Sequence, residues 1–155
     1  MVDNNLKHYF RGKHVHDTED NEHLDGRWVI GYLCNDDYIN SPQLEGEFLV
    51  DPDTICACTG LRDKNDVLIF EHDIVKLVLP NGCVRYFEIC IKNIVREVVC
   101  YSGFTPSTAN VEFVGVVFNW KGYDLLPCVE TFGVPDYKMS EVVGNTFDNP
   151  ELLDL

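Results

Sequence analysis

The chain has 155 residues, 45% of them hydrophobic, and its 26 acidic residues against 12 basic ones give a net charge of −14. This length and apolar content are enough for one domain with a core, and they exclude a disordered chain. A surface this acidic repels phosphate backbones, so nucleic acid is not an expected partner.

The N-terminal half shows the two-residue alternation of half-buried β-strands. In RWVIGYLC, residues 27–34, alternate side chains share a face, and Gly31 indicates a bulge or the close approach of another backbone. A short buried strand, VLIF at 67–70, is followed by the polar step EHD at 71–73 and by the strand IVKLVL at 74–79. Such a step is typical of the entry into the first long strand of an SH3-like barrel, where an acid accepts backbone N–H bonds.

The C-terminal half continues with hairpin and strand patterns. The PNG at 80–82 predicts a hairpin turn into a strand over 83–91. Further strands are predicted over 94–101 and 111–120. The composition of the stretch between them, 102–110, predicts a loop.

The end of the chain predicts one more strand, EVVGNTF at 141–147, and then a short helical turn that Asn149 caps and Pro150 begins. Six or more strands with almost no helix predict an all-β fold, a partly open, barrel-like one with an SH3-like element. We divide it into a small N-terminal β segment, residues 1–58, and a barrel-like β domain, residues 59–155, which we expect to form one folding unit.

Acidic residues cluster between the predicted strands at 59–73, which raises the possibility of a catalytic site. Two carboxylates used as acid and base need environments that separate their pKa values, and turn residues facing water do not provide them. We therefore predict no catalytic residues and interpret the turn, cap and glycine positions as structural. These positions are Gly60, Asp63, Asn65, Asp73, Gly144, Asn149 and Pro150.

Histidines and cysteines at alternating positions are weak candidates for a metal site. His14 and His16 share one face of an extended segment, and Cys56 and Cys58 share one face of another. A zinc site needs the fold to bring these pairs together, and Cys-x-Cys is a weaker signal than the usual Cys-x-x-Cys. We expect core cysteines and a solvent-facing histidine pair, with no metal or cofactor.

Two groups of residues are candidates for an interaction surface. Phe118, Trp120 and Tyr123 could form a stacking surface for a peptide or for bases, or pack into the core and its edge. The segment from Asp17 to Asp25 holds five acids in nine residues and is either a solvated loop or an acidic docking segment. Its candidate contact residues are Asp17, Glu19 and Asp20.

Several blocks of the sequence resemble, in order and chemistry, the YopX-like proteins, which are small proteins of bacteriophages and prophages. The resemblance implies an all-β architecture with a barrel-like part and no assigned enzymatic activity, cofactor or ligand. This chain has His72 where the family usually has Gly, which implies a strained or differently turned backbone if that position has a positive φ. The blocks are FRGK (10–13), RWVIGYL (27–33), VDPDTI (50–55), TGLRDKND (59–66), IFEHDIV (69–75) and VVGNTFDNPELL (142–153).

These observations favour a non-enzymatic interaction protein of a phage or prophage that binds a host or phage protein. Seven cysteines, the lack of a signal-like N-terminus and apolar runs too short for a bilayer predict a cytoplasmic protein with no membrane contact. The acidic segments would meet a basic partner, and open strand edges favour pairing with another copy. Two alternatives stay open: a nucleic-acid module or DNA mimic, the module using the strands between Lys76 and Lys121, and a metal-dependent hydrolase.

Overall fold

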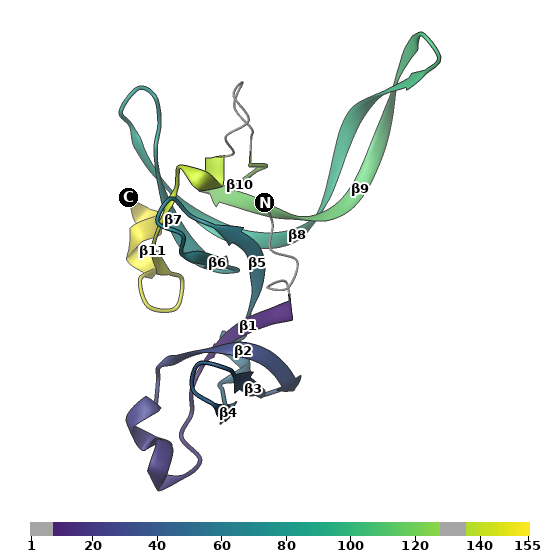
Figure 1. The fold of residues 1–155 in the computed structure, drawn as a ribbon. Coiled ribbons are helices and arrows are strands. Elements are labelled where there is room, and N and C mark those ends of the chain that lie inside the picture. The colour runs from purple at the N-terminus through teal and green to yellow at the C-terminus, as the bar shows by residue number, and fades with distance from the viewer. Residues whose placement is uncertain (1–7, 128–135) are drawn as a thin grey trace.

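The computed structural model describes residues 8–127 and 136–155 and consists mainly of antiparallel β-strands (Figure 1). Short 3₁₀ helices connect some of them: η2 Glu19–Leu24, η3 Pro52–Thr54, η4 Asp136–Lys138 and η5 Pro150–Asp154. The strands are β1 Tyr9–Lys13, β2 Trp28–Asn35, β3 Tyr38–Ser41, β4 Gly46–Leu49, β5 Cys56–Arg62, β6 Leu68–Phe70, β7 Asp73–Val78, β8 Val84–Ser102, β9 Thr105–Trp120, β10 Tyr123–Leu125 and β11 Glu141–Asn145.

The strands form two sheets, with the orders β4-β3-β2-β1-β5-β6 and β10-β9-β8-β7-β11. In Figure 1 the strands β1 to β4 lie at the bottom, and β5 leads from them toward the second sheet. The all-β prediction is confirmed, and the two sheets are not closed into a barrel. The predicted division between residues 58 and 59 falls inside β5. Within the described residues, no helix has the length and apolarity needed to cross a bilayer.

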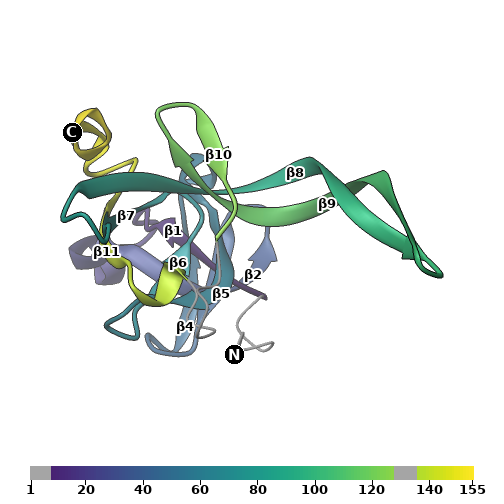
Figure 2. The same ribbon diagram turned by 90° about the horizontal axis from the view of Figure 1, so that it is seen from above.

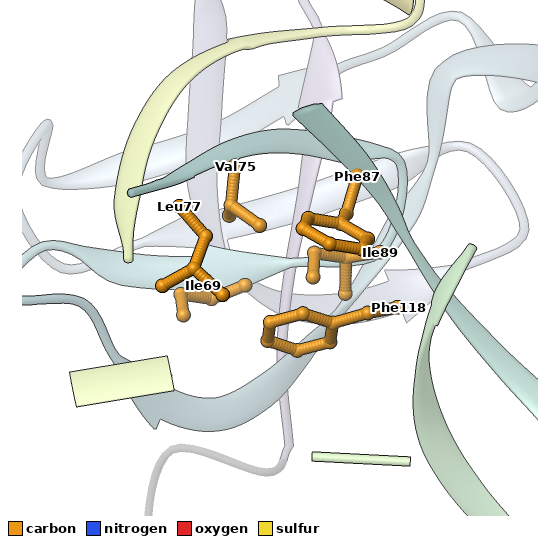
Figure 3. Packing of buried hydrophobic residues seen from close by; sticks show 6 residues of the cluster. All are labelled: Ile69, Val75, Leu77, Phe87, Ile89 and Phe118. Atoms are coloured by element: carbon orange, nitrogen blue, oxygen red, sulfur yellow. The ribbon is translucent and has the colours of Figure 1, made fainter. Parts of the chain in front are cut away.

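The largest buried cluster lies where β6 of the first sheet packs against the second sheet (Figure 3). Period-2 alternation places one face of each strand there, and burial of these aliphatic and aromatic side chains supplies the main driving force for docking the sheets. The cluster consists of Ile69 from β6, Val75 and Leu77 from β7, Phe87 and Ile89 from β8, and Phe118 from β9.

At Gly31 and His72 the local backbone geometry restricts which residue types fit. A Cβ at Gly31 would lie 1.9 Å from the carbonyl oxygen of Asn40 on β3, so the predicted close backbone approach is confirmed. His72 has φ +64°, in the left-handed region, between β6 and β7. The expectation of a strained turn at this position is therefore confirmed, and His72 Nδ1 lies 2.9 Å from Glu88 Oε1.

The C-terminal turn differs in detail from its prediction. Asn149 does occupy the N-cap position of η5, with Pro150 at its start, but its side chain makes no capping hydrogen bond. The side chain lies over Gly144 instead, where a Cβ would come within 2.5 Å of Asn149 Oδ1. Gly144 is thus the residue that allows this turn to fold back onto β11.

The largest departure from prediction is the hairpin of β8 and β9. Two strands over 83–91 and 94–101 were expected, but β8 is continuous from Val84 to Ser102. The prediction of a loop over 102–110 is wrong, because β9 begins at Thr105. Residues from Val95 outward are exposed on both faces, so their polar and apolar side chains do not alternate as they do in a half-buried strand.

Candidate functional site

Both carboxylate oxygens of Asp63 accept hydrogen bonds from backbone N–H groups. It is buried, its Oδ1 accepts hydrogen bonds from the N–H groups of Asn65 at 2.8 Å and Val67 at 2.9 Å, and its Oδ2 accepts one from Val142 at 2.8 Å. Asp63 thus closes its own turn and ties that turn to β11. Gly60, with φ +74°, lies in the strand that leads into it. A carboxylate engaged in this way has little capacity left for a substrate or an ion.

Asp73 is also engaged inside the protein. Its Oδ2 accepts a hydrogen bond from the N–H of Phe70 at 2.7 Å, and its Oδ1 lies 2.7 Å from Arg11 Nη1 in an ion pair. The Arg11 guanidinium lies over the rings of Trp28 and Phe70, 4.6 and 4.9 Å from their centroids. Burial raises the pKa of Asp73, and the positive charge of Arg11 opposes that rise.

The residues considered for a metal site do not gather. His14 is buried, with Nδ1 2.7 Å from the carbonyl oxygen of Leu49, so the expectation that both histidines face solvent is wrong for His14. His16 lies at the surface beside Asp25. Cys56 and Cys58 of β5 are buried in a cluster with Phe70 of β6. Over residues 8–127 and 136–155, no group of three or more potential metal ligands is present.

The buried thiols are held in their protonated form. Burial raises the pKa of Cys56 and of Cys58, although Arg11 and the Gly60 N–H respectively oppose the rise. Burial and the nearby charge of Glu88 raise the pKa of Cys90 to about 11. Because the thiolate is the nucleophile and the metal ligand, these three cysteines are poorly suited to either role.

The three predicted aromatic residues do not form one exposed surface. Phe118 is buried in the core, so its assignment as an interaction residue is incorrect. Trp120 is half-buried, and the Arg85 guanidinium lies over its ring, 4.4 Å from the centroid. Of the three, only Tyr123 is exposed, with 68% of its surface accessible. The Trp120 and Tyr123 rings lie beside each other, with centroids 6.4 Å apart, so two of the three predicted aromatic residues are together and Phe118 is not part of their surface.

The acidic residues predicted to contact a partner lie at the surface, between β1 and β2 of the first sheet. Asp17, Glu19 and Asp20 are exposed at the start of η2, which has no buried residue. The Asp17 carboxylate accepts a hydrogen bond from Asn21 Nδ2 at 2.8 Å, so the segment is ordered by its own polar groups. Its negative charge faces solvent.

The most exposed feature of the molecule is the distal part of the β8–β9 hairpin, residues 93–114, which we call the arm. It projects away from the rest of the chain in both views (Figures 1 and 2). Strand β7 pairs with β8 only between Val84 and Glu88, and β10 pairs with β9 only between Phe118 and Trp120. In the described parts of the chain, the two strands of the arm pair only with each other.

The register assigns the arm's side chains to two faces, because residues opposed across an antiparallel pair point the same way. One face, which we call the apolar face, carries a single charge. It consists of Ile94, which is buried against Cys90 and Val117, and of Arg96, Val98, Cys100, Ser102, Thr105, Ser107, Ala109, Val111 and Phe113. The other, which we call the mixed face, consists of Asn93, Val95, Glu97, Val99, Tyr101, Pro106, Thr108, Asn110, Glu112 and Val114.

Large apolar side chains on the arm face water. Relative exposures are 59% for Val99, 73% for Tyr101 and 72% for Val114, and Phe104 at the tip is fully exposed. Monomeric soluble proteins rarely expose contiguous apolar surface of this kind outside binding sites. An isolated two-stranded hairpin is also only marginally stable in water. Both facts favour a surface that another molecule covers.

The arm differs in charge from the rest of the chain. It carries one basic residue, Arg96, and two acids, Glu97 and Glu112, a net charge of −1. The remaining residues therefore carry −13 of the total of −14. The arm is a nearly neutral apolar extension of a strongly acidic protein.

A cavity of about 460 Å³ lies beside the base of the arm, between β7, β8 and β10. Its walls are mainly leucines and Phe87, and the four charged residues at its edge, Arg85, Arg96, Asp124 and Asp136, all have partners within the chain. Arg85 lies over Trp120, Arg96 donates to backbone carbonyls, and Asp124 pairs with Lys92 at 2.8 Å. The cavity thus lacks a convergent set of free polar groups, which ligand sites normally have.

The arm was not among the residues singled out from the sequence. The available signal was the Ser-Gly dipeptide at 102–103, a turn signal, between runs rich in valine and aromatic residues. Ser, Thr, Pro and Asn between 105 and 110 instead indicated a loop. On an arm exposed to water on both faces, such residues are compatible with a strand.

Comparison with known families gives one match. A model of the family described as YopX protein matches residues 2–154. The match includes the stretch from Cys83 to Lys138, which the six resembling blocks leave out. A search of the curated proteins gives no match.

Proposed function

We propose that this chain, which belongs to the YopX family, is a non-enzymatic protein that binds another protein through its arm. The observation that supports this most is the set of large apolar side chains that the arm exposes on strands paired only with each other in the described residues. The proposed partner is a host or phage protein in the cytoplasm of a bacterium that carries the gene on a phage or prophage.

The mixed face has the composition of a surface that binds a separately folded protein. Such interfaces combine apolar and aromatic anchors with a polar, charged rim. Tyr101 on this face and Phe104 at the tip provide aromatic anchors, and Glu97 and Glu112 provide charge beside them. Val99 lies between these groups on β8.

The acidic rest of the chain complements the arm by attracting a basic partner electrostatically before contact. A protein of net charge −14 attracts basic partners over distances of about a Debye length, ~8–10 Å at physiological salt. Exposed acids such as Asp17, Glu19 and Asp20 contribute to that field. Binding is therefore expected to begin faster at low ionic strength, with the arm providing the close contacts.

The proposal that the chain is not an enzyme draws support from its best candidate groups. Asp63 and Asp73 accept hydrogen bonds from backbone N–H groups, and Asp73 also pairs with Arg11. The pKa values of three buried thiols are raised. Groups used in catalysis usually lie in a cleft with capacity to accept or donate a proton, and these groups have structural partners instead.

Affinity capture with arm variants tests the proposal. The tagged full chain is incubated at low salt with lysate of a bacterial host, alongside Val99→Asp on the mixed face and Val15→Asp, an equal change at an exposed valine outside the arm. We expect a protein that is retained by wild type and Val15→Asp and lost with Val99→Asp. Equal retention by all three, or no retained protein at all, would contradict the proposal.

A further inference from the structure

We propose that the apolar face of the arm is covered by the same face of a second copy of this chain, with the two arms running in opposite directions. The inference deepens the proposed function, because it rests on the arm being a binding surface. It assigns the apolar face to self-association and leaves the mixed face and the tip for a different protein.

The composition of the two faces favours this division. Homodimer interfaces are more apolar than transient ones and are depleted of charged residues at their centre. The apolar face has Val98 and Ala109 opposite each other at its middle, with Val111 and Phe113 on the same strand. A surface of this kind matches itself without any charged group that needs a partner.

The single charge on the apolar face belongs to Arg96, on the fourth of the ten cross-strand pairs counted from the base, and it is engaged within its own chain. Arg96 Nη1 donates to the carbonyl oxygen of Val95 at 3.0 Å, and Nη2 lies 3.4 Å from that of Asp124. Arg96 thus has partners away from the middle of the face. Self-packing of the mixed face would instead bury Glu97 and Glu112 of each copy, four acids on a face that has no basic residue to pair with them, which is unfavourable.

The charge distribution favours contact at the arms over any other contact between copies. The parts of two copies outside the arm each carry a net charge of −13 and repel one another, whereas each arm carries a net charge of only −1. Ten cross-strand pairs, from Asn93–Val114 to Ser102–Thr105, make the arm about 34 Å long. Arms that run in opposite directions therefore separate the acidic remainders by more than a Debye length, ~8–10 Å.

The area is sufficient for a reversible dimer. A ribbon about 34 Å long and roughly 10 Å wide, with its side-chain relief, buries on the order of 1,000 Å² in total when two copies pack face to face. This is near the lower limit of specific interfaces. We therefore expect a concentration-dependent dimer rather than a permanent one.

Sedimentation equilibrium of the full chain over a hundredfold range of concentration tests the inference. Val98→Asp and Val99→Asp are matched variants, because the two valines are neighbours in β8, both are exposed, and they point to opposite faces. We expect wild type to dimerise, Val98→Asp to weaken dimerisation at least about tenfold, and Val99→Asp to change it less than about threefold. A monomeric wild type, or equal effects of the two substitutions, overturns the inference.

A second measurement needs no variant. Cys34, Cys83 and Cys100 are exposed, and only Cys100 lies on the apolar face. With rising protein concentration, the alkylation rate of Cys100 should fall while the rates of Cys34 and Cys83 stay constant. A Cys100 rate that does not change with protein concentration would contradict arm-to-arm packing. If the wild type is monomeric but Val99→Asp abolishes capture of the partner, only this inference is refuted. If the wild type is a dimer and Val99→Asp leaves capture of the partner intact, only the proposed function is refuted.

Discussion

The Arg11 guanidinium and the Asp73 carboxylate meet at 2.7 Å and join β1 of the first sheet to β7 of the second. Both residues are buried. The geometry of this contact is that of an ion pair without a well-aligned hydrogen bond, and Arg11 Nε has no hydrogen-bond partner. The rings of Trp28 and Phe70 hold the guanidinium in place, so the pair fixes the relative position of two sheets that no barrel closure holds together.

Replacing Arg11 with Met should destabilise the fold by about 3 kcal/mol, because it leaves the Asp73 carboxylate buried and unpaired while keeping most of the apolar volume. Urea unfolding of wild type and Arg11→Met measures the loss. The double variant Arg11→Met/Asp73→Asn should recover part of it, since the uncompensated charge is gone. A loss below about 1 kcal/mol in the single variant would show that the pair does not hold the sheets together.

The same variant should change the pH dependence of stability. Burial raises the folded-state pKa of Asp73 above its ordinary value of 3.8, and Arg11 opposes the rise. A raised carboxyl pKa means that the native state binds a proton more readily than the unfolded chain, so stability falls as pH increases from 3.8 through the folded pKa. Without Arg11 the pKa rises further. The stability gap between wild type and Arg11→Met should narrow on acidification, and a gap independent of pH would contradict this account.

Replacing Asp63 with Ala should cost about 3 kcal/mol, because the N–H groups of Asn65, Val67 and Val142 lose their acceptor. Asp63→Asn should cost less, since its amide oxygen can still accept two of these hydrogen bonds. Urea unfolding compares the two variants, and hydrogen exchange at the Val142 amide reports the link to β11. Equal losses in the two variants, or unchanged exchange at Val142, would contradict the role assigned to Asp63.

What the sequence predicts here is local. The hairpin turn at 80–82, the close approach at Gly31 and the left-handed turn at His72 follow from the chemistry of a few neighbouring residues. The Arg11–Asp73 pair does not, because its two members come from distant segments and nothing near Arg11 indicates burial.

The arm was missed for a different reason. Its strands have no buried face, so the alternation that reveals a strand is absent and Thr, Pro, Ser and Asn indicate a loop.

His72 offers a test of backbone strain. A non-glycine residue in the left-handed region costs roughly 1–2 kcal/mol, and the contacts of His72 with Glu88 and with the Phe147 ring, 5.7 Å away, offset part of that cost. His72→Gly and His72→Ala both lose these contacts, but only Gly relieves the strain. We expect His72→Gly to be about 1 kcal/mol more stable than His72→Ala in thermal or urea unfolding. An alanine variant as stable as the glycine variant would contradict the strained geometry.

The central claim is that the arm serves binding and contributes little to the stability of the rest of the chain. The direct measurement replaces residues 95–112 with an Asn-Gly turn, which joins the paired residues Ile94 and Phe113, and compares urea unfolding and partner capture with wild type. The account predicts an unfolding free energy within about 1 kcal/mol of wild type and complete loss of the captured protein. A shortened chain that no longer folds, or one that captures the same protein as wild type, would contradict it.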